Sequence, residues 1–154
     1  MKFAIIFLLF TLCFATPGLI TWKVCDDAYY HGHVSKLTIV NNPVVPGQNT
    51  TVSGFGFVDK DIITGTWSMS AYYNGVYMMY RTGDLCTNTT LDLPLNSGRI
   101  YLKGLNCPTP WGVVEVEQKA IFYEPPPPGI YSIRCKMHDQ DDEPILCLDI
   151  TIPM

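Results

Sequence analysis

Residues 130–152 read IYSIRCKMHDQDDEPILCLDITI, and this stretch decides the fold. Apolar and polar residues alternate in its first half and again in its second half, on either side of an acidic segment at 139–143. Because successive side chains of a strand point to opposite faces, each half predicts a half-buried strand, and the acidic segment predicts a solvated hairpin turn. The apolar faces consist of Tyr131, Ile133, Cys135 and Met137 in the first strand and Leu146, Leu148, Ile150 and Ile152 in the second.

The same period of two occurs earlier in the chain. It appears within 63–72, with Trp67, Met69 and Ala71 on one face, and within 114–122, with Val114, Val116, Ala120 and Phe122 on one face. Further strands are expected at 34–40, 50–58 and 76–80, and Asn74-Gly75 is a strong signal for a hairpin. About seven short strands without a helical period predict an all-β protein built as a two-sheet β-sandwich.

The chain begins with the pattern of a secretory signal peptide. Lys2 precedes an apolar run at 3–15, and small residues follow it. A membrane anchor is the alternative, but the run is shorter than the roughly 20 residues that span a bilayer. We therefore expect a signal peptide at 1–15, cleaved after Ala15 or as late as Gly18, and a single domain at 19–154. This predicts a protein that is secreted or resides in the lumen of the endolysosomal pathway.

Charge and motifs argue against several functions. The formal net charge is −4 and no cluster of Lys or Arg occurs, so a nucleic-acid partner is not expected. The Gly-x-Ser-x-Gly motif of hydrolases is absent from the sequence, and Asp84, Asp92, Asp139 and Asp141 look like solvated loop acids. The segment His31-Gly32-His33 lacks further ligands and is read as a surface loop. We expect neither catalysis, nor a metal, nor a cofactor.

The six cysteines predict disulfides. Cys13 falls in the predicted signal peptide, and the remaining five allow two bridges and a spare thiol, or an intermolecular bond. A bridge between Cys25 and Cys147 would join the two ends of the domain, Cys86 and Cys107 are natural partners between loops, and Cys135 is expected to be a buried free thiol.

Two sequons also suit a secreted surface. Asn49-Thr50-Thr51 and Asn88-Thr89-Thr90 predict glycosylation at Asn49 and Asn88.

An ordered series of short motifs resembles the ML-domain family of secreted lipid-recognition proteins. The family includes a sterol carrier, phosphatidylglycerol/phosphatidylinositol transfer proteins and a ganglioside activator. The resemblance covers nearly the whole predicted domain. The motifs are Trp22-x-x-Cys25-Asp26, Leu37-Thr38-Ile39, Pro43-Val44-Val45-Pro46-Gly47, Thr51-Val52-Ser53-Gly54, Gly83-Asp84-Leu85-Cys86, Asn106-Cys107-Pro108, Pro127-Pro128-Gly129-Ile130-Tyr131 and Leu146-Cys147-Leu148-Asp149-Ile150.

This resemblance implies an immunoglobulin-like β-sandwich whose sheets part to admit a lipid, without catalysis. It matches Cys25–Cys147 to the family's bridge between the chain ends and Cys86–Cys107 to the bridge near the cavity. The segment 41–47 lacks the further cysteine pair of many members, and the spacing of Cys86 and Cys107 is longer than in the sterol carrier. The lipid is thus left open between a sterol, a phospholipid and a glycolipid.

The cavity wall is expected to consist of the inward-facing apolar residues of the predicted strands. A lip of aromatic, proline and glycine residues is expected beside it, because polyproline is stiff and Gly129 permits a turn into the next strand. Function is predicted as lipid transfer between membranes with transient membrane contact; the alternative is an accessory module that presents lipid to a hydrolase or a receptor. The predicted wall is Trp67, Met69, Val114, Val116, Phe122, Tyr131, Ile133, Cys135, Met137, Leu148 and Ile150, and the predicted lip is Tyr123, Pro127, Pro128 and Gly129.

Overall fold

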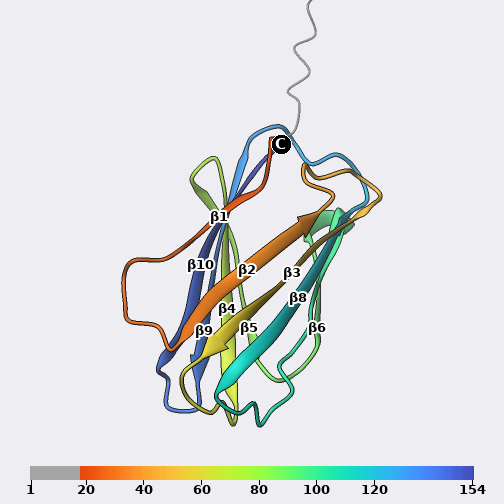
Figure 1. The fold of residues 1–154 in the computed structure, drawn as a ribbon. Coiled ribbons are helices and arrows are strands. Elements are labelled where there is room, and N and C mark those ends of the chain that lie inside the picture. Colours follow the sequence, from red (N-terminus) through yellow and green to blue (C-terminus); the bar gives the residue numbers. More distant parts are fainter. Residues whose placement is uncertain (1–17) are drawn as a thin grey trace, which may run out of the picture.

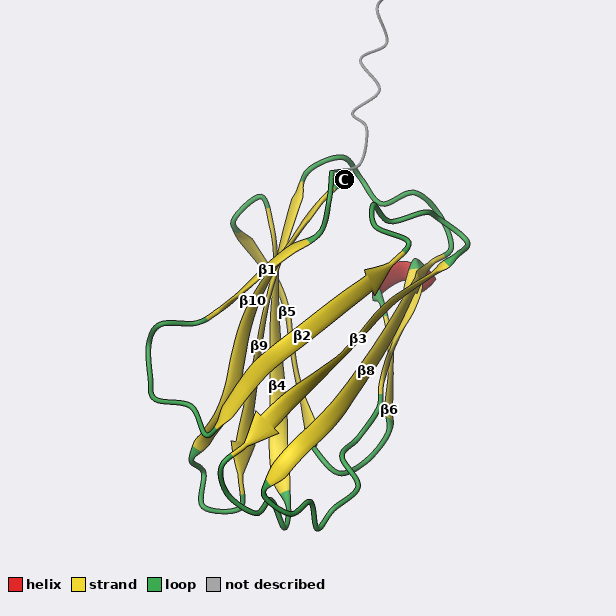
Figure 2. Cartoon of the chain, in the orientation of Figure 1, coloured by secondary structure: helices red, strands yellow, loops and turns green. Residues whose placement is uncertain are grey.

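The computed structural model describes residues 18–154, which form two antiparallel sheets packed face to face. Strands dominate the described chain, and its helical content is one short 3-10 turn, η1 (Pro94–Asn96), drawn red in Figure 2. The ten strands are β1 (Thr21–Val24), β2 (Gly32–Val40), β3 (Asn49–Val58), β4 (Gly65–Tyr73), β5 (Val76–Asp84), β6 (Thr89–Asp92), β7 (Gly98–Leu102), β8 (Gly112–Phe122), β9 (Ile130–Asp139) and β10 (Pro144–Pro153).

Each sheet has five strands. The first sheet has the order β1-β10-β9-β4-β5 and the second has the order β2-β3-β8-β7-β6. Figure 1 shows the two layers, with the strands of one sheet inclined to those of the other. The β1 and β2 edges lie on the same side of the sandwich, and the chain crosses from the second sheet to the first between β8 and β9. The prediction of a two-sheet β-sandwich is confirmed.

The register of the strands places the predicted apolar faces together. In the β9–β10 pair, Leu148 lies beside Cys135 and Ile150 beside Ile133. In the β4–β9 pair, Met69 lies beside Cys135. Because directly paired residues of neighbouring strands share a face, these side chains form one continuous inner surface of the first sheet.

Two turns were predicted from sequence. Asn74 and Gly75 both have positive φ values, 48° and 80°, which is the backbone of the tight hairpin expected between β4 and β5. The acidic segment does connect β9 and β10, but the expectation that all of it is solvated is wrong. Asp139 is buried, because its carboxylate accepts hydrogen bonds from the N–H groups of Asp141 and Glu143 and pairs with Lys60 Nζ at 2.5 Å.

Three strands escaped the sequence analysis, namely β1, β6 and β7. They have four or five residues each, too few to display a period of two. Because the first of the expected strands was 34–40, the sequence analysis placed Cys25 before the first strand, whereas the structure places it directly after β1. His31 lies before β2, but Gly32 and His33 belong to it, so the expectation of a surface loop there is wrong for these two residues.

The predicted signal peptide falls almost entirely outside the described residues. Of its two candidate cleavage sites, Ala15 lies outside them and Gly18 is the first residue described. Within 18–154, the structure holds no helix with the length and apolar character needed to cross a membrane.

One half of the interior is filled with side chains. Trp67 and Met69 from β4 and Met79 from β5 are each at most 7% exposed, and Leu85 at the end of β5 joins them. The cluster continues to the end of the sandwich opposite the termini. There it includes Val58, Ile62 and Ile145.

Candidate functional site

The other half of the interior is hollow. A pocket lies between β1, β10 and β9 of the first sheet and β2, β3 and β8 of the second. It holds about 1030 Å³ of space free of protein atoms, which includes its open mouth and is thus an upper limit for a guest in this conformation. The lining consists of Ile20, Trp22, Gly32, His33, Val34, Leu37, Ile39, Val52, Phe55, Gly56, Phe57, Val58, Ile62, Leu105, Val114, Val116, Gln118, Cys135, Met137, Ile145, Leu146, Leu148 and Ile150.

Two glycines of β3 allow β2 to approach closely beside the pocket. Strand β3 presents Gly54 and Gly56 at successive inward positions, paired with Val116 and Val114 of β8. A Cβ at Gly54 would overlap the Lys36 carbonyl of β2, so this position requires glycine for close approach of the two strands. A Cβ at Gly56 would likewise lie too close to the His33 carbonyl of β2, and of these two glycines Gly56 lines the pocket.

A bulge in β2 completes this wall. The β2–β3 register shifts between Val34 and Lys36, so one extra residue changes which positions of β2 point inward. Val34 lines the pocket before the bulge, and Leu37 and Ile39 line it afterwards. A strand without the bulge would turn one of these two groups toward solvent.

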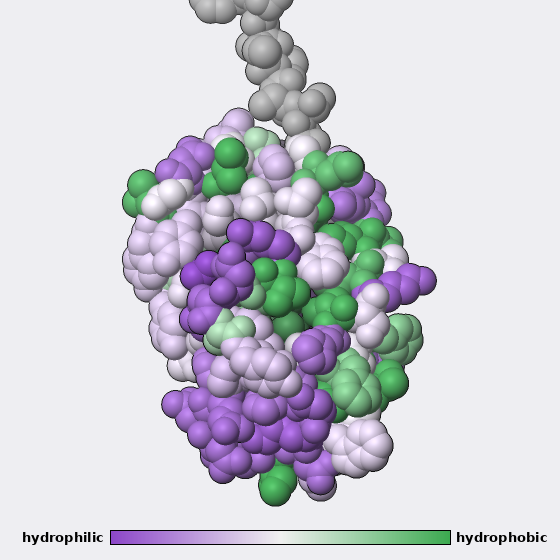
Figure 3. Space-filling view, turned by 60° about the vertical axis from the view of Figure 1, so that its left-hand side comes forward, coloured by the Kyte–Doolittle hydropathy of each residue, from purple (hydrophilic) through white to green (hydrophobic). Residues whose placement is uncertain are grey.

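The mouth of the pocket lies between the β1 and β2 edges. Trp22 of β1 lines the pocket and is 38% exposed, and His33 of β2 lines it from the opposite edge. Figure 3, which brings the β1 and β2 side forward, shows apolar side chains in green around a hollow flanked by hydrophilic ones in purple. A guest would enter sideways between the two edge strands.

The structure distributes the predicted wall residues over the interior. Val114, Val116, Cys135, Met137, Leu148 and Ile150 line the pocket. Trp67 and Met69 belong to the filled core and border a second, smaller pocket, while Ile133 packs against that core. Phe122 and Tyr131 are half-buried and line neither pocket.

Sequence reasoning missed the contributions of β1, β2 and β3 to the wall. The clearest overlooked signal is the run Val52, Gly54, Gly56 and Val58, where apolar residues and glycines alternate with larger or polar ones. The bulge in β2 has no comparable signature, because the residues around Ser35 do not interrupt the sequence pattern visibly.

The predicted lip residues lie in the crossing between β8 and β9, at the end of the sandwich that holds the C-terminus and Gly18 (Figure 1). Tyr131 donates its hydroxyl hydrogen bond to the Pro127 carbonyl at 3.1 Å, and Tyr73 does so to the Pro128 carbonyl at 2.9 Å. Gly129 exchanges backbone hydrogen bonds with Met154. The segment is therefore fixed in place, but neither it nor Tyr123 lines the pocket.

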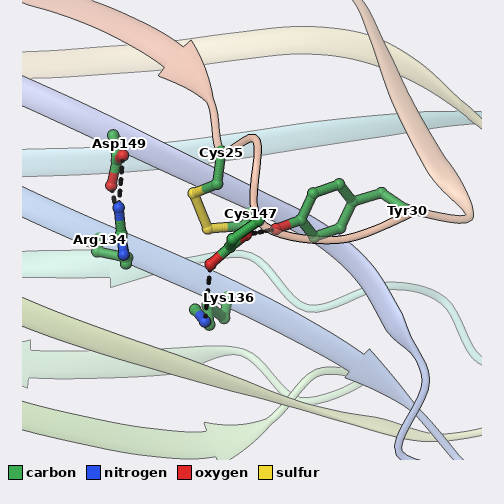
Figure 4. Close-up of a disulfide and its surroundings, with 7 residues drawn as sticks. Cys25, Tyr30, Arg134, Lys136, Cys147 and Asp149 are labelled. Carbon is green, nitrogen blue, oxygen red and sulfur yellow. Dashed lines mark hydrogen bonds and ion pairs between the residues drawn. A yellow bond between two sulfur atoms is a disulfide. The ribbon is translucent and has the colours of Figure 1, made fainter.

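Both predicted disulfides are present, and Cys135 is the free cysteine among residues 18–154. Cys25–Cys147 lies on the outer face of the first sheet and ties β1 to β10. Figure 4 shows Tyr30 beside this bridge. Its hydroxyl donates a hydrogen bond to the Asp27 carboxylate. Burial, followed by the hydrogen bond to Asp27, raises the pKa of Tyr30 to about 12, so the ring stays neutral as a cover for the disulfide.

The lining of the larger pocket has no Asp, Glu, Lys or Arg side chain. The Arg134 guanidinium holds the Asp149 carboxylate through two hydrogen bonds of 2.7 and 2.8 Å, and this contact lowers the pKa of Asp149 (Figure 4). Apart from His33 and Gln118, the pocket is lined by aliphatic, aromatic and sulfur-containing side chains and by glycines. Burial raises the pKa of the Cys135 thiol to about 12, so this thiol is a poor nucleophile.

An apolar hollow without a charged wall suits a hydrocarbon guest and offers no catalytic constellation among the described residues. The family comparison agrees with this reading, since the model of the ML domain matches residues 20–154. The chain belongs to the ML domain family. The family resemblance that the motifs predicted is confirmed.

Relatives of this ML domain protein include transfer proteins. A phosphatidylglycerol/phosphatidylinositol transfer protein of Candida albicans is 30% identical over 138 residues, which cover 88% of this chain and 66% of the relative. A putative protein of the same name from Dictyostelium discoideum is 24% identical over 131 residues, 85% of this chain and 78% of the relative. The chain thus spans about two thirds to three quarters of these relatives.

Two solved structures share the ML fold. A Niemann-Pick type C2 protein from the Japanese carpenter ant has a TM-score of 0.59 and 15% identity, covering 85% of this chain and 96% of that one. Chicken MD-1, solved in complex with lipid IVa, has a TM-score of 0.55 and 16% identity, covering 87% and 88%. At these identities the two structures establish the fold alone.

Proposed function

We propose that this ML domain protein is a lipid carrier that holds one lipid between its sheets and moves it between membranes. The observation that carries the proposal is the apolar pocket that opens between β1 and β2. Its opening is lateral and its wall is uncharged, so hydrocarbon can slide in or out without breaking an ion pair.

The energetics suit reversible transfer. Burial of each methylene is worth ~0.8 kcal/mol, so a tail of about ten methylenes gains roughly 8 kcal/mol relative to water. A bilayer offers the same tail a similar environment, which leaves the free energy of exchange between membrane and pocket near zero. A carrier needs this balance, because tight binding would prevent delivery.

The proposed lipid is a sterol or a phospholipid of the phosphatidylglycerol or phosphatidylinositol type. The names of the relatives support the phospholipid, since they are described as transfer proteins for it. We propose that the predicted wall residues that line the pocket contact the lipid tail. We also propose that the proline segment, residues 125–128 between β8 and β9, limits how far the two sheets separate at the end of the sandwich that holds the C-terminus. Brief contact of the protein with a membrane accompanies exchange.

The compartment follows from the covalent chemistry. Two disulfides favour folding in the secretory pathway and residence outside the cytosol. Asn49 and Asn88 are exposed, as glycosylation requires. The Oδ1 atom of Asn88 accepts a hydrogen bond from the Gly104 N–H at 2.9 Å, and its Nδ2 atom is the one that a glycan modifies.

A vesicle assay tests the proposal. Donor vesicles of phosphatidylcholine carry a fluorescent phosphatidylglycerol, phosphatidylinositol or sterol together with a quencher, and acceptor vesicles carry neither. We expect the protein to accelerate the loss of quenching for at least one of the three. If none is accelerated while a hydrolase or receptor is captured with the protein, the accessory module is the correct function and the carrier proposal fails.

A further inference from the structure

A second pocket lies behind the first, toward β4 and the end of β7. It holds about 430 Å³ of space free of protein atoms, including its open part. Trp67, Met69, Leu85 and Leu102 border it, together with Gly104 and the polar residues Ser68, Thr87, Lys103 and Lys136. The first pocket is called the larger chamber below, and this second pocket beside the filled core is called the smaller chamber.

Three side chains border both chambers, namely Gln118, Cys135 and Met137. They come from β8 and β9, the third strand of each sheet counted from the mouth side. They therefore stand at the back of the larger chamber, opposite the mouth, and all three are half-buried because they face open space on two sides.

These side chains differ from the rest of the wall in polarity and flexibility. Gln118 places an amide on a wall that is otherwise nearly all apolar, and burying an amide against hydrocarbon without a hydrogen bond is unfavourable. Met137 is unbranched and adapts its shape to its neighbours. A hydrocarbon tail that reaches this point meets a polar group and a movable side chain.

We propose that Gln118, Cys135 and Met137 form a partition that sets the length of the lipid tail that the pocket accepts. Tails that fit the larger chamber end at the partition, and longer tails must displace it to enter the smaller chamber. This inference rests on the proposed lipid-carrier function. It adds that the protein selects its lipid by the length of the tail.

The test measures capture of phosphatidylglycerol species of increasing tail length from phosphatidylcholine vesicles. Up to the limit, each added methylene exchanges one apolar environment for another, so capture stays level. Beyond the limit, the membrane still accommodates each added methylene but the pocket does not, and capture falls about fourfold per methylene, which corresponds to ~0.8 kcal/mol.

Met137→Ala removes most of a partition side chain and should move the limit to longer tails. For a tail two methylenes beyond the wild-type limit, we expect capture to rise about fifteenfold. Met79→Ala is the matched control, because Met79 is 7% exposed, belongs to the core and lines neither pocket. This control should lose stability without moving the limit.

Two further readouts keep the inference testable if Met137→Ala does not fold. Gln118→Leu removes the amide at nearly constant volume and should also raise capture of tails beyond the limit. In the wild-type protein, tails long enough to reach the partition should slow alkylation of Cys135 by N-ethylmaleimide, and shorter tails should not.

The outcomes separate the two proposals. A limit that does not move in Met137→Ala or Gln118→Leu, with tails still captured and Cys135 labelled at the same rate at every length, overturns the partition alone. If the wild-type protein captures a sterol but no phospholipid of any tail length, the partition is overturned and the carrier function stands. If it captures neither phosphatidylglycerol, nor phosphatidylinositol, nor a sterol, the lipid-carrier function itself is overturned, and the partition with it.

Discussion

Val116→Trp distinguishes a hollow sandwich from a filled one. Val116 lines the pocket from β8, and its partner on β3 is Gly54. A tryptophan there has room to lie in the pocket. In a filled interior the same change would overpack the core and cost about 1–3 kcal/mol of unfolding free energy.

The magnitude of the effect on lipid follows from the volume that the ring occupies. Tryptophan carries about seven more heavy atoms than valine and would displace on the order of four methylenes of a guest. At ~0.8 kcal/mol per methylene this is roughly 3 kcal/mol, or about a hundredfold loss of lipid capture. The free energy of unfolding should stay the same or rise, because the added ring buries apolar surface in empty space.

The matched control is Val113→Trp on the same strand. Val113 points outward and is 75% exposed, so this change should alter neither stability nor capture. Urea unfolding measures stability and vesicle extraction measures capture. The reasoning is refuted if Val116→Trp destabilises the protein by several kcal/mol, or if it folds stably and still captures lipid like the wild type.

Three further predictions concern the frame around the pocket. Loss of Cys25–Cys147 should cost more unfolding free energy than loss of Cys86–Cys107, because the sequence separations are 122 and 21. The chain-entropy model gives a difference of about 1.5 kcal/mol. Urea unfolding of the two paired serine variants measures this difference, and equal costs would contradict it. Asp139→Asn should destabilise the protein at neutral pH. Although burial raises the pKa of Asp139, hydrogen bonds from Lys60 and from two backbone N–H groups lower it further, so its stabilising effect exists above the unfolded pKa of about 3.9 and disappears as the pH falls through the lower native pKa. The difference in melting temperature between variant and wild type should therefore shrink on acidification below about pH 4, and a constant difference would refute this. Tyr131→Phe should release the Pro127 carbonyl. Prolines 125–128 have no N–H, so the effect is measured as faster hydrogen exchange at the Gly129 amide, which donates to the Met154 carbonyl. Tyr29→Phe, at an exposed position, is the control and should leave this exchange rate unchanged.

The sequence predicted the strands, the hairpin and the disulfides better than it predicted the pocket. Strands β4, β8, β9 and β10 have long alternating patterns, and the hairpin at Asn74-Gly75 has a strong local signature, so both were found. The disulfide between Cys25 and Cys147 followed from the outward position of Cys147 and the position of Cys25 near the start of the domain.

The pocket depended on features that alternation alone does not reveal. Trp67 and Met69 were expected on the cavity wall because they face inward, yet a residue that faces inward can meet either a guest or another side chain. Here both meet the filled core, since β5 and the loop after it supply Met79 and Leu85 as partners. The opposite half holds the pocket. There the glycines of β3 bring this strand close to β2, and the bulge in β2 changes which of its residues point inward, so only packing in three dimensions shows the wall.

Asp139 shows the same limit for charged residues. Its position in an acidic turn predicts solvation, but Lys60 from the β3–β4 connection reaches it across 79 positions of the chain and makes its burial tolerable. No local pattern signals such a pair.

Native mass spectrometry of protein purified from a eukaryotic secretory host tests the central claim most directly. The account predicts a species heavier than the protein by the mass of one lipid, which extraction with organic solvent removes and which is absent from Val116→Trp. It is contradicted if the protein keeps the mass of the bare chain both as purified and after incubation with vesicles that contain phosphatidylglycerol, phosphatidylinositol and sterol.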